Sequence, residues 1–242
     1  MRVGVISDIH GNLHALEAVL TAVDAEGVDV VWCLGDVVGY GPRPNECCSL
    51  VAERAAICLV GNHDLGVLGR ISLDEFSHEA AAAARWTAQV LDPGARAFLE
   101  RLQPALDTER VTLAHGSVRD PVWEYVLSRD AARASLAVAA RRVALVGHSH
   151  AALVFTDDES FDGGLAVGGT EVDLAEPTRW LLNPGSVGQP RDGDPRAAWL
   201  LLDDERMHAS WRRAEYPVER TQQEIVERGL PDSLALRLAD GF

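Results

Sequence analysis

The sequence contains no lysine. All 22 of its basic residues are arginine, against 37 acidic residues, and the formal charge is -15. An acidic chain repels the phosphate backbone of nucleic acids at long range, so no stable nucleic-acid binding is expected. An anionic substrate would therefore have to be attracted by a local positive centre.

Long apolar runs and disulfide patterns are also missing. The longest apolar runs, such as 80–84 and 199–202, fall far short of the roughly 20 residues that span a bilayer, so no membrane association is expected. The apolar stretch after Met1 is too short for the core of a signal peptide. Four cysteines without a CxxC spacing do not make a disulfide framework. These absences favour a cytoplasmic protein with reduced thiols.

What is present is the composition of an ordinary globular protein, and its 242 residues favour a single domain over 1–242. The first half predicts strands at 3–6, 28–34, 57–60, 111–114 and 143–146. It predicts helices at 13–23, 45–54, 72–91, 92–102 and 128–138. After residue 150, short apolar runs (153–155, 171–174, 179–182, 197–202 and 207–213) predict an antiparallel meander, and two helices follow near 218–228 and 233–238. This order predicts an α/β fold of two packed sheets flanked by helices.

Five of the predicted strands end in side chains that can bind a metal. These are Asp8 with His10, Asp36, Asn62 with His63, His115, and His148 with His150. In open α/β sheets, ligands gather beyond the carboxyl ends of the strands, and five of the eight histidines lie at such ends. A single histidine there would indicate little, but five strand ends together predict a metal site.

Imidazole nitrogens and carboxylate or amide oxygens, without cysteine, suit Mn, Fe, Zn, Co or Ni better than Ca or Mg alone. Seven side chains can hold two divalent ions if one carboxylate bridges them: Asp8, His10, Asp36, Asn62, His115, His148 and His150. Two-metal sites hydrolyse phosphate esters, here with a metal-bridging hydroxide as nucleophile. Two divalent ions, less the two aspartates and the hydroxide, leave about one net positive charge, which is the local attraction that an anionic substrate needs.

The same residues, in this order, resemble the calcineurin-like metallophosphoesterase superfamily. The pattern consists of Asp8-Ile9-His10, Gly35-Asp36, Gly61-Asn62-His63-Asp64, His115-Gly116 and Gly147-His148-Ser149-His150. The resemblance is strong over residues 3 to about 150 and continues more weakly through 183–188, as in the small prokaryotic phosphodiesterase branch. It implies a four-layer α/β/β/α sandwich of two mixed sheets between helices.

The resemblance also implies a role for each site residue. The first metal would be bound by Asp8, His10 and His150, and the second by Asn62, His115 and His148, with Asp36 as the bridge. His63 would not be a ligand but would lie by the leaving group, as a general acid or as a cation on the phosphoryl oxygens. Asp64 would orient His63.

Other residues admit two interpretations each. Arg70, Arg119 and Arg191 could clamp a substrate phosphate, although most arginines are simply solvated. Tyr40 and Trp123 could stack on a base, although such aromatics more often serve packing. Residues 65–105 are the least family-like part of the chain, and we expect them to form a small helical cap that sets specificity.

The leading function is therefore a metal-dependent phosphoesterase acting on small, anionic phosphodiesters, including nucleotide-derived ones. The first alternative is a phosphomonoesterase of the protein serine/threonine phosphatase or dinucleoside tetraphosphatase type, because all of these share the metal core. The second is a non-catalytic scaffold of the same fold, which the presence of His63 and of every ligand disfavours. A homo-oligomer is left open.

Overall fold

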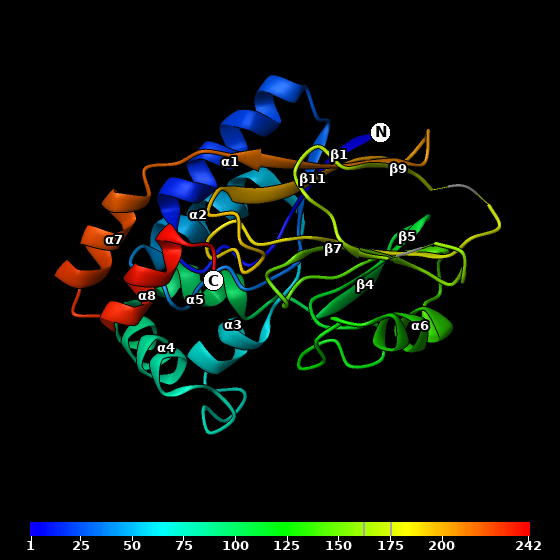
Figure 1. Cartoon of the computed structure of the whole chain (residues 1–242). Coiled ribbons are helices and arrows are strands. Elements are labelled where there is room, and N and C mark those ends of the chain that lie inside the picture. Colours follow the sequence, from blue (N-terminus) through cyan, green and yellow to red (C-terminus); the bar gives the residue numbers. More distant parts are fainter. Residues whose placement is uncertain (162, 175) are drawn as a thin grey trace.

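Two six-stranded sheets packed face to face form the centre of the computed structural model (Figure 1). The structure describes residues 1–161, 163–174 and 176–242. The strand order is β3-β2-β1-β11-β12-β9 in the first sheet and β4-β5-β6-β10-β7-β8 in the second. The strands are β1 (Arg2–Ile6), β2 (Val30–Cys33), β3 (Ala55–Cys58), β4 (Ala105–Asp107), β5 (Val111–Ala114), β6 (Val143–Leu145), β7 (Ala152–Thr156), β8 (Gly164–Leu165), β9 (Glu171–Asp173), β10 (Trp180–Pro184), β11 (Ala197–Asp203) and β12 (His208–Ala214).

Helices cover the outer faces of both sheets. Helices α1 and α2 pack on the first sheet, and α6 packs on the second, which confirms the α/β/β/α layers. The helices are α1 (Leu13–Glu26), α2 (Pro44–Arg54), α3 (Asn62–Val67), α4 (His78–Val90), α5 (Pro93–Leu99), α6 (Arg129–Val138), α7 (Val218–Glu227) and α8 (Asp232–Leu236), followed by the 3-10 turn η1 (Arg237–Ala239). Within the described ranges, no helix is both long and apolar enough to cross a membrane.

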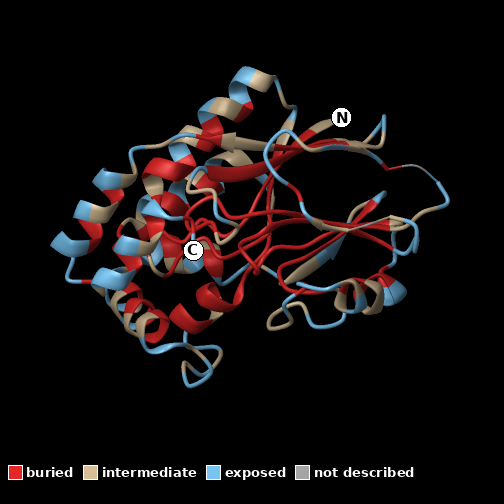
Figure 2. Ribbon diagram, in the orientation of Figure 1, coloured by how far each residue is buried: buried red, intermediate tan, exposed pale blue. Residues whose placement is uncertain are grey.

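One hydrophobic core lies between the sheets, where the strands are buried along most of their length (Figure 2), and another lies between the first sheet and helices α1 and α2. Strands β1, β2 and β3 are parallel to one another, as are β5, β6 and β10. Their near-continuous apolar sequences are typical of parallel strands that are buried on both faces. Because the carboxyl ends of parallel strands share one edge of a sheet, the loops that follow β1, β2 and β3 meet there, as do those after β5 and β6.

Side chains cap the helices where the sequence indicated. Asn12 and Asp92 begin α1 and α5 as predicted, and Ser128 begins α6. The helix predicted over 72–91 begins only at His78, because Ser77 accepts a hydrogen bond from the backbone NH of Ala80 and so sets its first turn. The short helix α3 was not predicted. Its N-cap is Gly61, which has no side chain to cap the helix, so the sequence gives no signal for a helix start there.

The strands after residue 150 pair with one another antiparallel as predicted, but the predicted meander is wrong, because they are divided between the two sheets. Strand β10 lies between β6 and β7, parallel to β6, and β11 crosses to the first sheet and pairs antiparallel with β1. The two-residue strand β8 and the edge strand β4 were not predicted either. Pairing between distant segments leaves no local pattern in the sequence, so the five apolar runs were found but their partners were not.

Candidate metal centre

The strand-end residues come together in two groups that share one carboxylate. Asp8, His10, Asp36 and His150 form the first group, and Asp36, His115 and His148 form the second. Within each group the potential ligand atoms lie within 4.8 Å of one another. All six side chains are at most 2% exposed. The two sheets therefore bring together residues that are up to 142 positions apart in the sequence.

In the first group, the Nε2 atoms of His10 and His150 are 2.9 Å apart. Oδ1 of Asp8 lies 3.5 Å from the Nε2 atom of His150, and Oδ2 of Asp36 lies 3.6 Å from that of His10. In the second group, the Nε2 atom of His115 lies 3.4 Å from Oδ2 of Asp36. The amide oxygen of Asn62 is 3.2 Å from the same nitrogen, so the structure also brings Asn62 to this group.

Backbone carbonyls fix which ring nitrogen of each histidine is free. The Nδ1 atoms of His10, His115 and His150 donate to the carbonyl oxygens of residues 38, 34 and 189. A carbonyl can only accept, so these Nδ1 atoms carry a proton, and Nε2 is the ring atom of each that could bind a metal. His148 is reversed, because its Nε2 atom donates to the carbonyl of Trp123 at 3.2 Å and leaves Nδ1 as the available ligand atom.

Two observations show that this donor set fits a cation. Burial lowers the pKa of His10 and of His150 well below the usual range, so two unprotonated nitrogens face each other at 2.9 Å. Between the two groups, Oδ2 of Asp36 is buried and has no hydrogen-bond partner among the described residues. Such lone pairs are unfavourable in a buried site unless a positive charge lies among them.

The remaining charges of the centre are strongly coupled. Burial raises the pKa of Asp8 to about 7, although the charge of His115 opposes this shift. Burial also acts against the charge of Asp36, but the positive charges of His115 and His63 hold the pKa of Asp36 well below its usual range. In turn, burial opposes the positive charge of His115, but the charges of Asp36 and Asp8 and the hydrogen bonds of the ring together raise the pKa of His115 to about 9. A metal ion bound by His115 would displace that proton.

Five of the candidate ligands have a left-handed backbone. The φ angles are 54° for Asp8, 50° for His10, 53° for Asp36, 64° for His148 and 58° for His150. Such angles are strained for residues that have a Cβ atom, and strain of this kind clusters at functional sites. The tight turns after β1, β2 and β6 are therefore held in place by the surrounding fold.

The glycine before Asn62 is required by close packing. A Cβ atom on Gly61 would lie 2.0 Å from Oδ1 of Asp36. That oxygen instead accepts a hydrogen bond of 2.9 Å from the backbone NH of His63. The turn that carries Asn62 and His63 can therefore approach Asp36 only because residue 61 has no side chain.

His63 lies over the first group, but Asp64 does not orient it. The His63 ring is in edge contact with the ring of His10, with 4.8 Å between their centroids. The carboxylate of Asp64 accepts from the backbone NH groups of Val38 and Gly61, each at 3.0 Å, and so joins the loops after β2 and β3. Nδ1 of His63 is buried without a hydrogen-bond partner among the described residues, and burial lowers the pKa of His63 to about 4. The carboxylate of Asp64 therefore stabilises the loop, and no hydrogen bond joins it to the His63 ring that it was expected to orient.

A cavity of about 740 Å³ opens beside the two groups. Tyr40, Trp123 and Arg191, which the sequence had left between two interpretations, all line it. Arg119 instead pairs with Glu124, and Arg70 donates to the carbonyl of residue 100. The full lining is Tyr40, Asn62, His63, Glu75, Phe76, Ser77, Ala80, Trp123, Tyr125, Arg191 and Arg237.

Six lining residues were not singled out from the sequence, among them Phe76, Tyr125 and Arg237. Phe76 contacts the rings of His63 and Trp123, Tyr125 stacks on His148 at 3.9 Å, and Arg237 reaches the cavity from the C-terminal turn η1. Phe76 and Tyr125 belong to no recognisable motif. Nothing in the sequence separates Arg237 from the other arginines, most of which are expected to be solvated. No signal in the sequence would have selected them.

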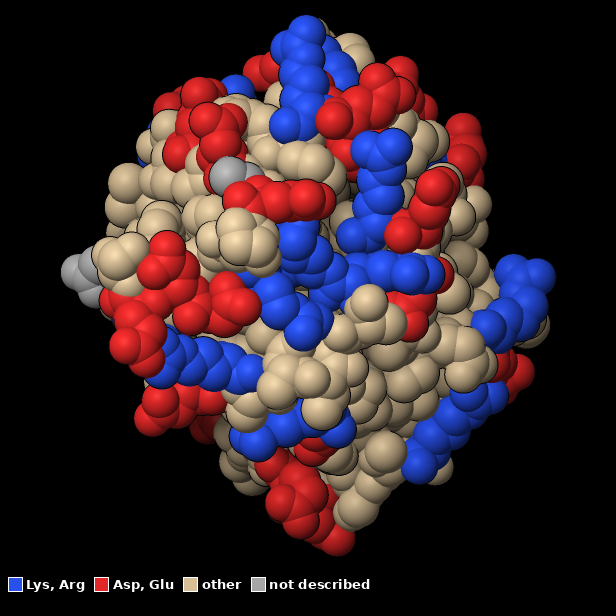
Figure 3. All heavy atoms as spheres, turned by 90° about the vertical axis from the view of Figure 1, so that its right-hand side faces the viewer, with Lys and Arg blue, Asp and Glu red and all other residues tan. Residues whose placement is uncertain are grey.

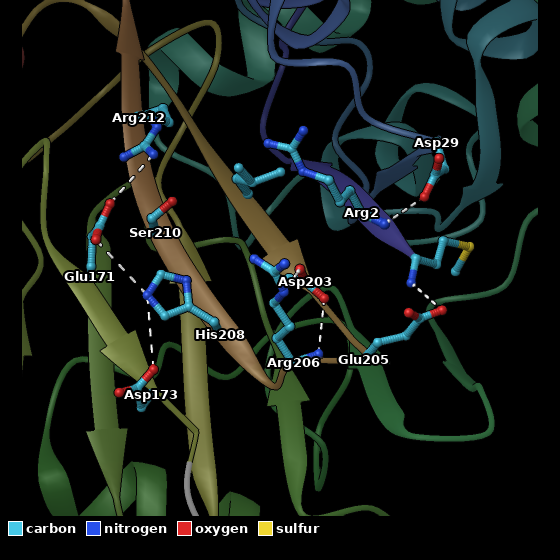
Figure 4. Close-up of a pocket in the computed structure, with 12 residues that line it drawn as sticks. Arg2, Asp29, Glu171, Asp173, Asp203, Glu205, Arg206, His208, Ser210 and Arg212 are labelled. Atoms are coloured by element: carbon cyan, nitrogen blue, oxygen red, sulfur yellow. Dashed lines mark hydrogen bonds and ion pairs between the residues drawn. The ribbon is translucent and has the colours of Figure 1, made fainter.

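A second cavity, of about 730 Å³, lies at the amino-terminal end of β1, away from Asp8. We call it the sheet-face cavity. Its charged side chains turn toward one another (Figure 4): Arg212 and His208 face Glu171, and Arg206 faces Asp203. On the face of the molecule shown in Figure 3, arginines and acidic side chains are likewise interspersed. That face presents no extended field of one sign.

The chain belongs to the calcineurin-like phosphoesterase superfamily. The family model described as the calcineurin-like phosphoesterase superfamily domain matches residues 1–205. This confirms the resemblance and the fold class, and it places the chain among metal-dependent phosphoric ester hydrolases. The buried histidines and aspartates provide a candidate metal site of the kind that such enzymes use.

Two similar proteins span nearly the whole chain. The crystal structure of a metallophosphoesterase from Sphaerobacter thermophilus is 42% identical, covers 100% of this chain and 99% of its own, and superposes with a TM-score of 0.91. An uncharacterised protein of Methanocaldococcus jannaschii is 37% identical over 241 residues, which are 98% of this chain and 96% of that protein.

Two further relatives have named activities. Phosphodiesterase YfcE of Escherichia coli is 27% identical over 215 residues, or 85% of this chain and 89% of that protein. The symmetrical bis(5'-nucleosyl)-tetraphosphatase of Vibrio cholerae is 32% identical over 136 residues, or 53% of this chain and 49% of that protein. The second match therefore covers about half of each chain.

Proposed function

We propose that this protein hydrolyses small phosphodiesters at a two-metal site. The observation that carries the proposal is the pair of buried groups that share Asp36, with its unpartnered Oδ2 atom between them. Asp36 would bridge the two ions. The first ion would be held by Asp8, His10 and His150, and the second by Asn62, His115 and His148.

Two divalent ions there, from among Mn, Fe, Zn, Co and Ni, would supply an activated water and would neutralise charge on the phosphoryl oxygens. The protein's own residues supply orientation. The backbone carbonyls that bind the histidine rings fix their tautomers, so the ligand atoms point inward before any ion arrives. Asp64 joins the loops after β2 and β3 and so keeps Asn62 near His115.

His63 is the group placed to act on the departing oxygen. It lines the cavity directly beside the first group. With a pKa of about 4 it is neutral near pH 7 in the unliganded site. A bound phosphate ester would bring negative charge next to the ring and raise that pKa, because a nearby opposite charge favours the protonated form. His63 could then donate a proton to the leaving alkoxide.

The cavity favours a diester of nucleotide size. Its volume of about 740 Å³ is far larger than a phosphate group needs, and Phe76, Trp123 and Tyr125 contribute aromatic surface to it. Aromatic faces stack on nucleobases with little regard to sequence. The name of the YfcE relative supports a diester substrate. The tetraphosphatase relative supports the alternative, a dinucleoside polyphosphate, which would use the same metal centre.

We further propose a single domain over 1–242 in which part of 65–105 acts as a cap. Residues 75–80 supply Glu75, Phe76, Ser77 and Ala80 to the cavity, whereas α5 packs away from it on α2. Residues 75–80, rather than the whole of 65–105, would then set the substrate specificity. The four unpaired cysteines are compatible with a cytoplasmic location, which also remains a proposal.

The test is hydrolysis after removal and readdition of single metals. The protein is stripped with a chelator, reloaded separately with each of the five metals, and assayed with bis(p-nitrophenyl) phosphate, p-nitrophenyl phosphate, cyclic nucleotides and diadenosine tetraphosphate. We expect metal to restore activity, with diesters faster than the monoester. Faster cleavage of the tetraphosphate would favour the alternative. No restored hydrolysis of any substrate would favour a scaffold.

A further inference from the structure

Two arginines stand side by side on the wall of the catalytic cavity. Nη2 of Arg191 and Nη1 of Arg237 both donate to Oε1 of Gln189, at 2.8 and 3.2 Å. Gln189 is buried, and its backbone carbonyl also accepts from Nδ1 of His150. The pair is therefore anchored on the same residue that orients a candidate metal ligand.

Among the described residues, no acidic side chain forms an ion pair with Arg191 or Arg237. Glu75, which also lines the cavity, bonds to neither of them. The other contacts of the pair are to the hydroxyl of Tyr40, at 3.3 Å from Arg191, and to the main-chain oxygen of Phe242, at 2.6 Å from Arg237. The Nε atom of Arg191 is buried and has no hydrogen-bond partner among the residues that the structure describes.

Two adjacent cations that form no ion pair with an acidic side chain repel each other. Burial and the charge of Arg191 lower the pKa of Arg237 below its usual value, which records this repulsion. In the sheet-face cavity, by contrast, Arg2, Arg206 and Arg212 each form an ion pair with an acidic side chain. In a protein of net charge -15, an unpaired pair of arginines is a local site for an anion.

The pair lies beside the metal centre without bonding to its candidate ligands. The guanidinium carbon of Arg191 lies 5.7 Å from the centre of the Tyr40 ring, and the same ring contacts those of His63 and His10, at 4.4 and 4.7 Å between centroids. The side-chain hydrogen bonds of Arg191 go to Gln189 and Tyr40, and none goes to a candidate metal ligand. A phosphoryl group bound at the metals would leave the arginines free for another part of the substrate.

We infer that Arg191 and Arg237 form a second anion site, which binds a phosphate group of the substrate other than the one that is cleaved. This inference rests on the proposed function and narrows it. The preferred substrate would be a phosphodiester that carries an additional phosphate group, no more than about one nucleotide length away from the phosphate that is cleaved. Planar guanidinium groups match phosphate oxygens in geometry, and a pair of them can share one phosphate.

The experiment compares two substrates that differ only in that phosphate. p-Nitrophenyl thymidine 5'-phosphate is assayed with and without a 3'-phosphate, and release of p-nitrophenolate is followed for both. We expect the wild type to have a KM about tenfold or more lower for the compound with the 3'-phosphate, as charge-assisted hydrogen bonds allow. Arg237→Gln should lose this advantage, so that the ratio of the two KM values falls to about one.

Two further variants keep the test decisive. Arg237→Lys keeps the positive charge and should keep part of the preference for the 3'-phosphate. If Arg237→Gln lost the preference only because its fold was damaged, retention of charge in Arg237→Lys would not rescue it. Arg70→Gln is the matched control, because Arg70 lies outside the cavity and should leave the preference intact. Equal KM values for both substrates in the wild type, or an undiminished preference in Arg237→Gln, would overturn the second anion site. Absence of metal-dependent cleavage of either substrate would instead overturn the proposed function.

Discussion

Two cavities of nearly equal volume, about 740 and 730 Å³, contain the same kinds of charged residue but differ in how those charges are satisfied. In the sheet-face cavity, His208, Glu171 and Asp173 are 34%, 54% and 89% exposed, and Glu171 pairs with Arg212. Beside the catalytic cavity, the aspartates and histidines are almost completely buried and keep lone pairs that no donor satisfies. The comparison teaches that buried charged or polar groups without partners, rather than the number of charged residues, mark a binding site.

The largest expected difference between the two regions concerns a single carboxylate. Asp36→Ala should remove both metals and abolish hydrolysis, because Asp36 belongs to both ligand groups. Metal content measured by mass spectrometry, together with diester turnover, provides the test. Asp203→Ala, in the sheet-face cavity, is the control and should change neither quantity. Two bound ions per chain in Asp36→Ala would disprove the bridge.

The next comparison sets one histidine against another. His63→Ala should keep both metals and lose roughly 10²–10⁴-fold in turnover on esters with poor leaving groups, the range typical of a general acid. The loss should be smaller for p-nitrophenolate, which needs little protonation to depart. His208→Ala should behave as wild type. Equal losses for good and poor leaving groups would assign His63 to phosphoryl binding, and loss of metal would make it a ligand.

A smaller effect is expected from one added charge in the metal centre. Asn62→Asp would bring the loaded site from about one net positive charge to about zero, so anion binding should weaken while metal is kept or bound more tightly. Inhibition by vanadate and metal content are measured in parallel. An unchanged inhibition constant would contradict this account of the site's charge.

The smallest effects concern stability and compare ion pairs near and far from the centre. A hydrogen bond from Arg43, which outweighs burial, lowers the pKa of Glu224 from 4.5 to about 2, so Glu224 stabilises the folded state above about pH 4.5 and this contribution is lost as the pH falls toward 2. Glu224→Gln should lower the free energy of unfolding by about 1–3 kcal/mol at pH 7. Glu171→Gln, at an exposed pair, should lower it by about 0–1 kcal/mol. Denaturant titrations at pH 7 and pH 3 would test both values, and a Glu224→Gln deficit that did not shrink at pH 3 would contradict the assignment.

The sequence was informative wherever the structure depends on local order. Asp8, Asp36 and His115 each follow an apolar run that does form a strand, and the predicted strand ends do meet at one place. The layers could also be predicted, because strands and helices alternate through the first half of the chain. The family pattern added which residues belong together, and the structure places Asn62 and His148 with His115 and Asp36 accordingly.

What depends on distant pairing could not be predicted. Strand β11 lies beside β1, almost 200 positions away, and Arg237 reaches the cavity from the last turn of the chain. The resemblance to the family suggested that Asp64 would orient His63. Adjacent residues at a helix start point in different directions, however, and the carboxylate of Asp64 is held by two backbone NH groups instead.

The left-handed backbone at five candidate ligands also limits how the protein could be engineered. Glycine would relieve the strain at each of these positions, by on the order of 1 kcal/mol, but it would delete the ligand at the same time. Directed evolution for heat resistance would therefore be expected to gather such substitutions only in variants that no longer need metal. A library of variants selected for stability alone would lose the metal ligands first. A library selected for both stability and metal-dependent hydrolysis should instead accumulate changes in the outer helices.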